Sequence, residues 1–228
     1  MGSCCASSSV NMEGEEFLRQ LLLSDSLVIR SFDYMTLLNE IFDNRVDQQI
    51  PKKHIREFLI PEFYDKQKSG NYDVYFQSLF DLIVNQFDEE SNMYLVLLYF
   101  YPFVRHNKEK IYENFFDCIR LITNSKYGIG RRELENWLLK YITFCTMDIT
   151  YCIYIKCPTG DDLSGSLSTL INRVFTETNI KSFTKKLISI MTDDNPVDLI
   201  TVEMFKKLFN QYDISTIENV RDFILHDV

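Results

Sequence analysis

The residues with the most specific chemical potential lie at the amino end of the chain, in the stretch MGSCCASSS. Gly2 follows the initiator methionine and can accept an N-myristoyl chain, although the usual pattern asks for Ser or Thr where this chain has Ala6. Cys4 and Cys5 lie beside it as natural sites for S-palmitoylation. One myristoyl chain binds membranes only marginally, and residues 1–16 contain no Lys or Arg to supply a second signal. We expect an anchor of myristate and palmitate; the alternative is a tail of small residues that happens to include two cysteines.

The other side chains that could do chemistry form no recognisable catalytic or metal-binding set. The three histidines have no neighbouring Cys or second His at the spacing of a zinc site. The sequence has no GxSxG elbow, no phosphate-binding glycine loop and no CxxC pair. We therefore predict a protein that is not an enzyme, has no catalytic residue and needs no cofactor. The other four of the six cysteines are expected to be reduced core residues.

Composition indicates a helical protein. The chain of 228 residues is 46 % hydrophobic, yet it contains only seven Gly and five Pro, too few turn residues for a β-sandwich or barrel. A formal net charge of −9 without a basic stripe argues against a nucleic-acid partner. No run of apolar residues is long enough to span a bilayer. We predict an all-α fold of about ten helices in which any strands are very short.

Apolar positions recur at helical spacing in segments that polar breaks separate. Residues 1–12 are predicted to be a flexible tail, and 13–157 and 166–228 to be two helical regions packed together across a linker at 158–165. Tyr94–Val104 is nearly all apolar and is expected to be a central buried helix that Pro102 ends or kinks. Its aromatic side chains belong either to the core or to a groove for a partner, and the pattern leaves both open.

Three of the polar breaks share one spacing. In each, a helix ends, a short polar stretch follows, and an Ile precedes a large apolar residue by five positions. The stretches are DNRVDQQIPKKHI, VRHNKEKIYENFF and DDNPVDLITVEMF, and their isoleucines are Ile50, Ile111 and Ile200. The bland interpretation is a set of ordinary helix–loop–helix connections in an unrelated α domain.

The spacing resembles the EF-hand, a helix–loop–helix unit whose twelve-residue loop carries an aliphatic residue at its eighth position. The resemblance extends over roughly residues 30–212. It implies EF-hand-like pairs in which two loops join through very short β-bridges while the flanking helices pack as a four-helix unit. It also implies that the paired helices take up a partner's amphipathic helix in an apolar groove.

The ligand positions that the resemblance implies are poorly filled. The first loop keeps Asp43 and Asp47, and the last keeps Asp193 and Asn195, but neither ends in the bidentate glutamate that a Ca²⁺ loop requires. The first loop also has Gln48 where the turn glycine belongs. A fourth register, with Ile129 at the eighth position, has Glu133 at the twelfth but Ile122 and Lys126 at ligand positions. We predict degenerate loops without a metal; the alternative is one weak Ca²⁺ site at Asp43 with Asp47 or at Asp193 with Asn195.

Myristoylated EF-hand proteins, among them the calcineurin B subunit and the neuronal calcium sensors, combine an amino-terminal lipid with paired EF-hands. This chain resembles them in both respects. The resemblance implies a non-enzymatic adaptor or regulatory subunit that acts without Ca²⁺. We expect it at the cytoplasmic face of a membrane through lipids on Gly2, Cys4 and Cys5, with a protein partner and no nucleic acid. The alternative is a Ca²⁺-responsive regulatory subunit that retains one weak site.

Overall fold

The computed structural model describes residues 33–59, 73–150 and 172–227, and these residues are mostly helical. The helices are α2 (Tyr34–Asp43), α3 (Lys52–His54), η2 (Ile55–Leu59), α5 (Asp73–Val84), α6 (Met93–Phe100), η3 (Tyr101–Phe103), α7 (Ile111–Ile122), α8 (Arg131–Thr143), η4 (Phe144–Asp148), α11 (Glu177–Thr192), α12 (Val202–Gln211) and α13 (Ile217–Asp227). The strands of these ranges are β1 (Gln49–Pro51), β2 (Glu90–Asn92), β3 (Ile129–Gly130) and β4 (Leu199–Ile200). The predicted all-α fold with very short strands is confirmed.

Short polar side chains fix where several helices begin. Asp33 accepts a hydrogen bond from the Thr36 amide at 2.9 Å at the start of α2, and Asn92 accepts one from the Tyr94 amide at the start of α6. Thr176 does the same for α11 through the Asn179 amide, at 3.1 Å. Such caps satisfy amides that have no partner within the helix, so they define the first residue of each element.

The four strands join the loops in two antiparallel pairs. Strand β1 pairs with β2, which places Ile50 opposite Ser91, and β3 pairs with β4, which places Ile129 opposite Ile200. Each strand lies in the connection between two helices, and we call these connections loop 1 (44–51), loop 2 (85–92), loop 3 (123–130) and loop 4 (193–201). The described residues therefore contain four helix–loop–helix units, and loop 1 pairs with loop 2 and loop 3 with loop 4.

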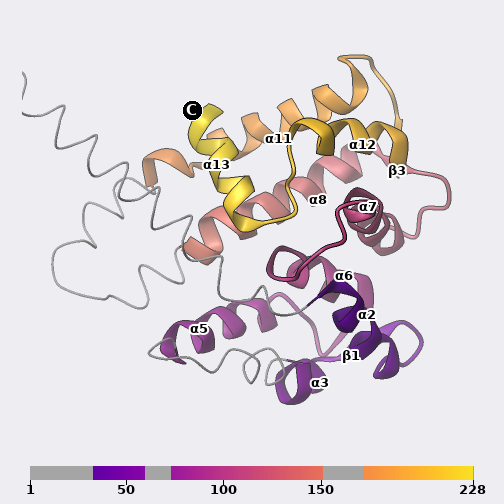
Figure 1. Ribbon diagram of the computed structural model, residues 1–228, viewed down its shortest axis with the longest axis vertical. Helices are drawn as coiled ribbons and strands as arrows, with labels where there is room; N and C mark the ends of the chain where they lie inside the picture. Colours follow the sequence, from indigo (N-terminus) through magenta and orange to yellow (C-terminus); the bar gives the residue numbers. More distant parts are fainter. Residues whose placement is uncertain (1–32, 60–72, 151–171, 228) are drawn as a thin grey trace, which may run out of the picture.

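The helices of the two pairs share one hydrophobic core. Figure 1 shows α2, α3 and α5 in the lower half of the view and α8, α11, α12 and α13 in the upper half, with α6 and α7 between them. Helix α6 packs against α7, and α7 packs against α12. Phe115 of α7 stacks on Phe205 of α12 with ring centroids 5.8 Å apart, and both rings are fully buried. The core cluster runs from Tyr34 to Ile224.

The apolar run at residues 94–104 behaves as its composition predicts. Helix α6 is buried on several sides, and Pro102 lies in the short turn η3 that follows it, so the α-helix ends early. Phe100, Tyr101 and Phe103 are all buried, which assigns them to the core. Trp137 of α8 is only partly buried, and the ammonium group of Lys140 lies 4.5 Å from the centre of its ring.

The prediction for Ile111 is wrong. Ile111 is the first residue of α7, and Ser91 takes the place opposite Ile50 in the strand pair. Helix α6 is the exit helix of the second unit, so the polar stretch after it connects two units instead of forming a paired loop. The predicted tail at 1–12 and linker at 158–165 lie outside the described residues, and β3 pairs with β4 across that linker. Within the described ranges no helix is long and apolar enough to cross a membrane.

Candidate functional site

The residues predicted to carry function lie in separate places. Gly2, Cys4 and Cys5 fall outside the described residues. Asp43 ends α2 and Asp47 lies in loop 1, and both side chains are exposed. Ile50 and Ile200 are buried strand residues that lie opposite Ser91 and Ile129. The residues of loop 4 are described below.

Loop 1 makes its sharp turn without glycine. Asp47 and Gln48 have φ values of 49° and 67°, in the left-handed region where glycine has no steric penalty. The EF-hand resemblance implies a turn glycine at the position of Gln48, and the φ value of Gln48 is one that glycine adopts without steric penalty. The guanidinium group of Arg45 lies over the ring of Phe42, 3.9 Å from its centre. This contact places a cation of the protein on the last turn of α2, within the stretch of chain that contains Asp43 and Asp47.

The polar side chains of loop 4 form hydrogen bonds and an ion pair within the protein. The ammonium group of Lys207, from α12, forms an ion pair with the Asp193 carboxylate at 2.5 Å. The Asn195 side-chain amide donates to the Asp193 carbonyl at 3.2 Å, and Ser189 donates its hydroxyl proton to the Asp194 carboxylate. Asp193 and Asp194 both have positive φ values, which short acidic side chains tolerate better than most. Asp193, a ligand only in the alternative of one weak Ca²⁺ site, is thus paired with a cation of the protein.

Basic side chains also bind carbonyl oxygens of loops 2 and 3. Lys52, the first residue of α3, donates from Nζ to the Phe87 carbonyl of loop 2 at 2.7 Å. Arg120 of α7 donates from Nη1 to the Ser125 carbonyl of loop 3 at 3.3 Å and pairs with Asp117 at 2.8 Å. Positive groups next to a loop repel a divalent cation and compete for its oxygen ligands. In the parts of the chain that the structure describes, His, Cys, Asp and Glu form no group of three or more arranged to hold a metal ion.

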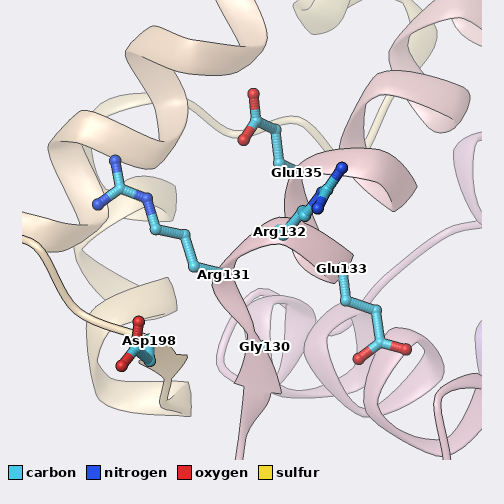
Figure 2. A pocket seen from close by; sticks show the side chains of 6 residues that line it. All are labelled: Gly130, Arg131, Arg132, Glu133, Glu135 and Asp198. Carbon is cyan, nitrogen blue, oxygen red and sulfur yellow. The ribbon is translucent and has the colours of Figure 1, made fainter.

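A shallow, open pocket of about 410 Å³ lies at the start of α8 beside the pair of β3 and β4. Figure 2 shows Arg131 and Arg132 leaving the backbone after Gly130 in opposite directions, with Arg131 on the side of Asp198. Side chains of both signs line this pocket, and its residues are Gly130, Arg131, Arg132, Glu133, Glu135 and Asp198. Because the lining residues include three carboxylates and two guanidinium groups, the pocket is not selective for ligands of one charge.

An exposed apolar strip runs along α2 and into loop 1. Met35 and Phe42 are 57 % and 38 % exposed, and Val46 of loop 1 is 67 % exposed. Met35, Leu38 and Phe42 are spaced by three and four residues, which places them on one face of the helix next to its buried face. We call Met35, Leu38, Phe42 and Val46 the apolar strip. Among the described residues, the other large apolar side chains that are exposed are Tyr127 and Leu199.

Buried titratable groups gather where α2, η3 and α7 meet. His106 stacks on Tyr101 with ring centroids 3.9 Å apart, and its Nε2 lies 2.7 Å from the Tyr101 carbonyl. The Tyr34 hydroxyl lies 3.7 Å from the Cys118 sulfur. Burial raises the pKa of Cys118 to about 12, and burial lowers the pKa of His106 to about 4. At neutral pH the thiol is protonated and the imidazole is neutral, so this cluster lacks the thiolate and imidazolium of an activated nucleophile.

Comparison with known proteins gives no match: no family model, no curated protein and no solved structure resembles the chain at a significant level. The interpretation therefore rests on the chemistry of the residues. Sequence reasoning missed the apolar strip, although the spacing of Met35, Leu38 and Phe42 was a usable signal. It also missed Lys52 and Arg131, which each directly follow a strand and whose equivalence becomes visible only once the loops are paired.

Proposed function

We propose that the protein is a non-enzymatic adaptor or regulatory subunit. It binds an amphipathic helix of a partner protein and acts without Ca²⁺, and lipids on Gly2, Cys4 and Cys5 hold it at the cytoplasmic face of a membrane. The four helix–loop–helix units, paired through short antiparallel strands, are the arrangement that the EF-hand resemblance implies, and they support this reading.

The observation that carries the proposal is the apolar strip. Three of its side chains, Met35, Phe42 and Val46, are exposed at 57 %, 38 % and 67 % within twelve residues of chain. Exposing large apolar side chains to water is unfavourable unless another surface covers them, and groups of such side chains mark binding sites. An amphipathic helix matches a narrow strip because its own apolar residues recur at three and four positions.

Acidic side chains flank the strip and favour a basic partner helix, although the guanidinium group of Arg45 lies over Phe42 within it. Asp33 at the start of α2, Asp43 at its end and Asp47 in loop 1 all have exposed side chains. The whole chain has a formal net charge of −9, which speeds the approach of cationic partners and slows that of anionic ones. The partner's helix should therefore carry apolar residues on one face and Lys or Arg beside them.

Independence from Ca²⁺ is supported by the basic groups in the loops. The Asp193 carboxylate is paired with Lys207, and the guanidinium group of Arg45 in loop 1 lies over the ring of Phe42. A divalent ion would have to displace or approach these positive groups, which raises the free energy of binding.

A binding experiment with a defined peptide tests the proposal. The probe is a fluorescein-labelled helix of Leu and Lys, about five turns long, with Leu on one face. We expect the triple variant Met35→Ser/Phe42→Ser/Val46→Ser to bind it at least tenfold more weakly than the unmodified protein, because a few buried apolar anchors dominate such interfaces. The matched control, Tyr127→Ser/Leu199→Ser, removes the exposed apolar side chains near β3 and β4 and should bind normally. Equal affinity in both variants would refute the assignment of the strip.

Fractionation of eukaryotic cells tests the membrane part of the proposal separately. The full chain with its native amino end is compared with Gly2→Ala and with Cys4→Ser/Cys5→Ser. We expect the unmodified protein in the membrane pellet and both variants in the soluble fraction, because one lipid alone gives weak and reversible binding. If all three proteins are soluble, the lipid anchor is wrong, whatever the peptide experiment gives.

A further inference from the structure

The two loop pairs are closed by the same backbone contact. The first residue of α3 donates its amide to loop 2, from Lys52 N to the Glu89 carbonyl at 2.8 Å. The first residue of α8 donates its amide to loop 4, from Arg131 N to the Asp198 carbonyl at 2.8 Å. Glu89 and Asp198 each directly precede the second strand of the pair, so Lys52 and Arg131 occupy equivalent places.

Both equivalent residues are basic, and both side chains reach further into the same partner loop. Lys52 Nζ donates to the Phe87 carbonyl of loop 2 at 2.7 Å. Arg131 Nη1 donates to the Asn195 carbonyl of loop 4 at 3.3 Å. One residue therefore binds its partner loop twice, through the backbone and through a charged donor, and this happens in each pair.

The following residue in each case makes no such contact and serves as an internal comparison. Lys53 has a side chain that is 78 % exposed and lies 3.9 Å from Glu57 within its own helical segment. Arg132 is exposed and points away from Arg131 in the view of Figure 2. The sequence pairs Lys52-Lys53 and Arg131-Arg132 thus each contain one residue that spans two loops and one that does not.

The positive charge of Lys52 and Arg131 strengthens their hydrogen bonds because the acceptors are carbonyl oxygens of a turn. A loop that bends sharply turns several carbonyl oxygens the same way, and such oxygens need donors or a cation. A hydrogen bond from an ammonium or guanidinium group is stronger than one from a neutral donor. We propose that Lys52 and Arg131 are clasps: each holds the second loop of its pair against the first and brings a positive charge of the protein itself to that loop.

Hydrogen exchange on the full chain in EDTA tests the clasps. Lys52→Met and Arg131→Met keep an unbranched chain of similar length and remove the charged donor, and Lys53→Met and Arg132→Met are the matched controls. We expect the amides of 85–92 to exchange about tenfold faster in Lys52→Met, and those of 193–201 about tenfold faster in Arg131→Met, as loss of one charge-assisted hydrogen bond predicts. Each variant should leave the other pair unchanged.

Two outcomes would overturn the inference. In the first, the loop amides of Lys52→Met and Arg131→Met exchange at the same rates as in their controls, so these side chains do not stabilise the loops. In the second, the loops of the unmodified protein exchange slowly only after CaCl₂ is added, so a metal rather than the clasps orders them. The inference does not depend on partner binding or on lipids, and the peptide and fractionation experiments leave it untouched.

Discussion

Replacing Gly128 by alanine should push β3 and β4 apart. Gly128 lies directly before β3, and a Cβ atom added to it would come within 2.6 Å of the Ile200 carbonyl oxygen and 2.9 Å of Leu199 Cγ. Contacts this short do not occur at real Cβ atoms, and the nearer atom belongs to the backbone of β4, which cannot turn aside as a side chain can. The pairing of Ile129 with Ile200 must therefore shift.

Overfilling a packed site in this way costs roughly 1–3 kcal/mol of unfolding free energy. For a domain of this size, each 1 kcal/mol lowers the melting temperature by about 2–4 °C, so we expect Gly128→Ala to melt at least 2 °C lower. The control is Gly130→Ala two residues later, where the nearest atom, Glu133 Oε2, would lie at 3.7 Å. Thermal unfolding followed by circular dichroism measures both. Identical melting temperatures for the two variants would refute the close approach of loops 3 and 4.

Three further predictions follow from individual residues. Gln48→Gly should raise the unfolding free energy by up to about 1 kcal/mol in urea denaturation, because φ is 67° there, whereas a loss would mean that the Gln48 side chain is needed. Phe205→Ala should lower it by about 3–5 kcal/mol, since the ring is fully buried against Phe115; a cost below 1 kcal/mol would contradict this packing. The pKa of His106 is lowered to about 4, so the unfolded chain binds a proton near pH 6.5 that the folded protein resists, and stability falls as pH drops from about 6.5 towards 4. Urea denaturation should show that the unfolding free energy falls by about 2 kcal/mol between pH 7.5 and pH 5, and that this loss is absent in His106→Gln. An equal loss in the variant would show that His106 is not its cause.

The sequence predicted those parts of the fold that depend on apolar periodicity. The helices around the paired loops and the strand positions of Ile50 and Ile200 follow from side chains that must be buried on one face. The prediction failed at Ile111 because the true partner of Ile50 is Ser91, a small polar residue without an apolar signal. An isoleucine that begins a helix and one that pairs in a loop look the same when only spacing is read.

The candidate site was less accessible to sequence reasoning because it depends on three-dimensional pairing. Lys52 and Arg131 each stand in a doublet of like charges, and nothing local distinguishes them from Lys53 and Arg132. Their equivalence appears only when loop 1 is set against loop 2 and loop 3 against loop 4. The pairing of Asp193 with Lys207 likewise joins residues fourteen positions apart on different elements. A ligand set read from loop positions alone does not reveal a cation supplied by a neighbouring helix.

The central claim is that the protein binds a partner helix without Ca²⁺, and one measurement tests it most directly. The affinity of the unmodified protein for the labelled Leu/Lys helix is determined by fluorescence anisotropy in EDTA and again in CaCl₂ at equal ionic strength. Because Lys207 already pairs with Asp193 and basic side chains bind loops 2, 3 and 4, we predict the same dissociation constant in both buffers. Binding that appears only with CaCl₂ would contradict the account and favour a Ca²⁺-responsive regulatory subunit.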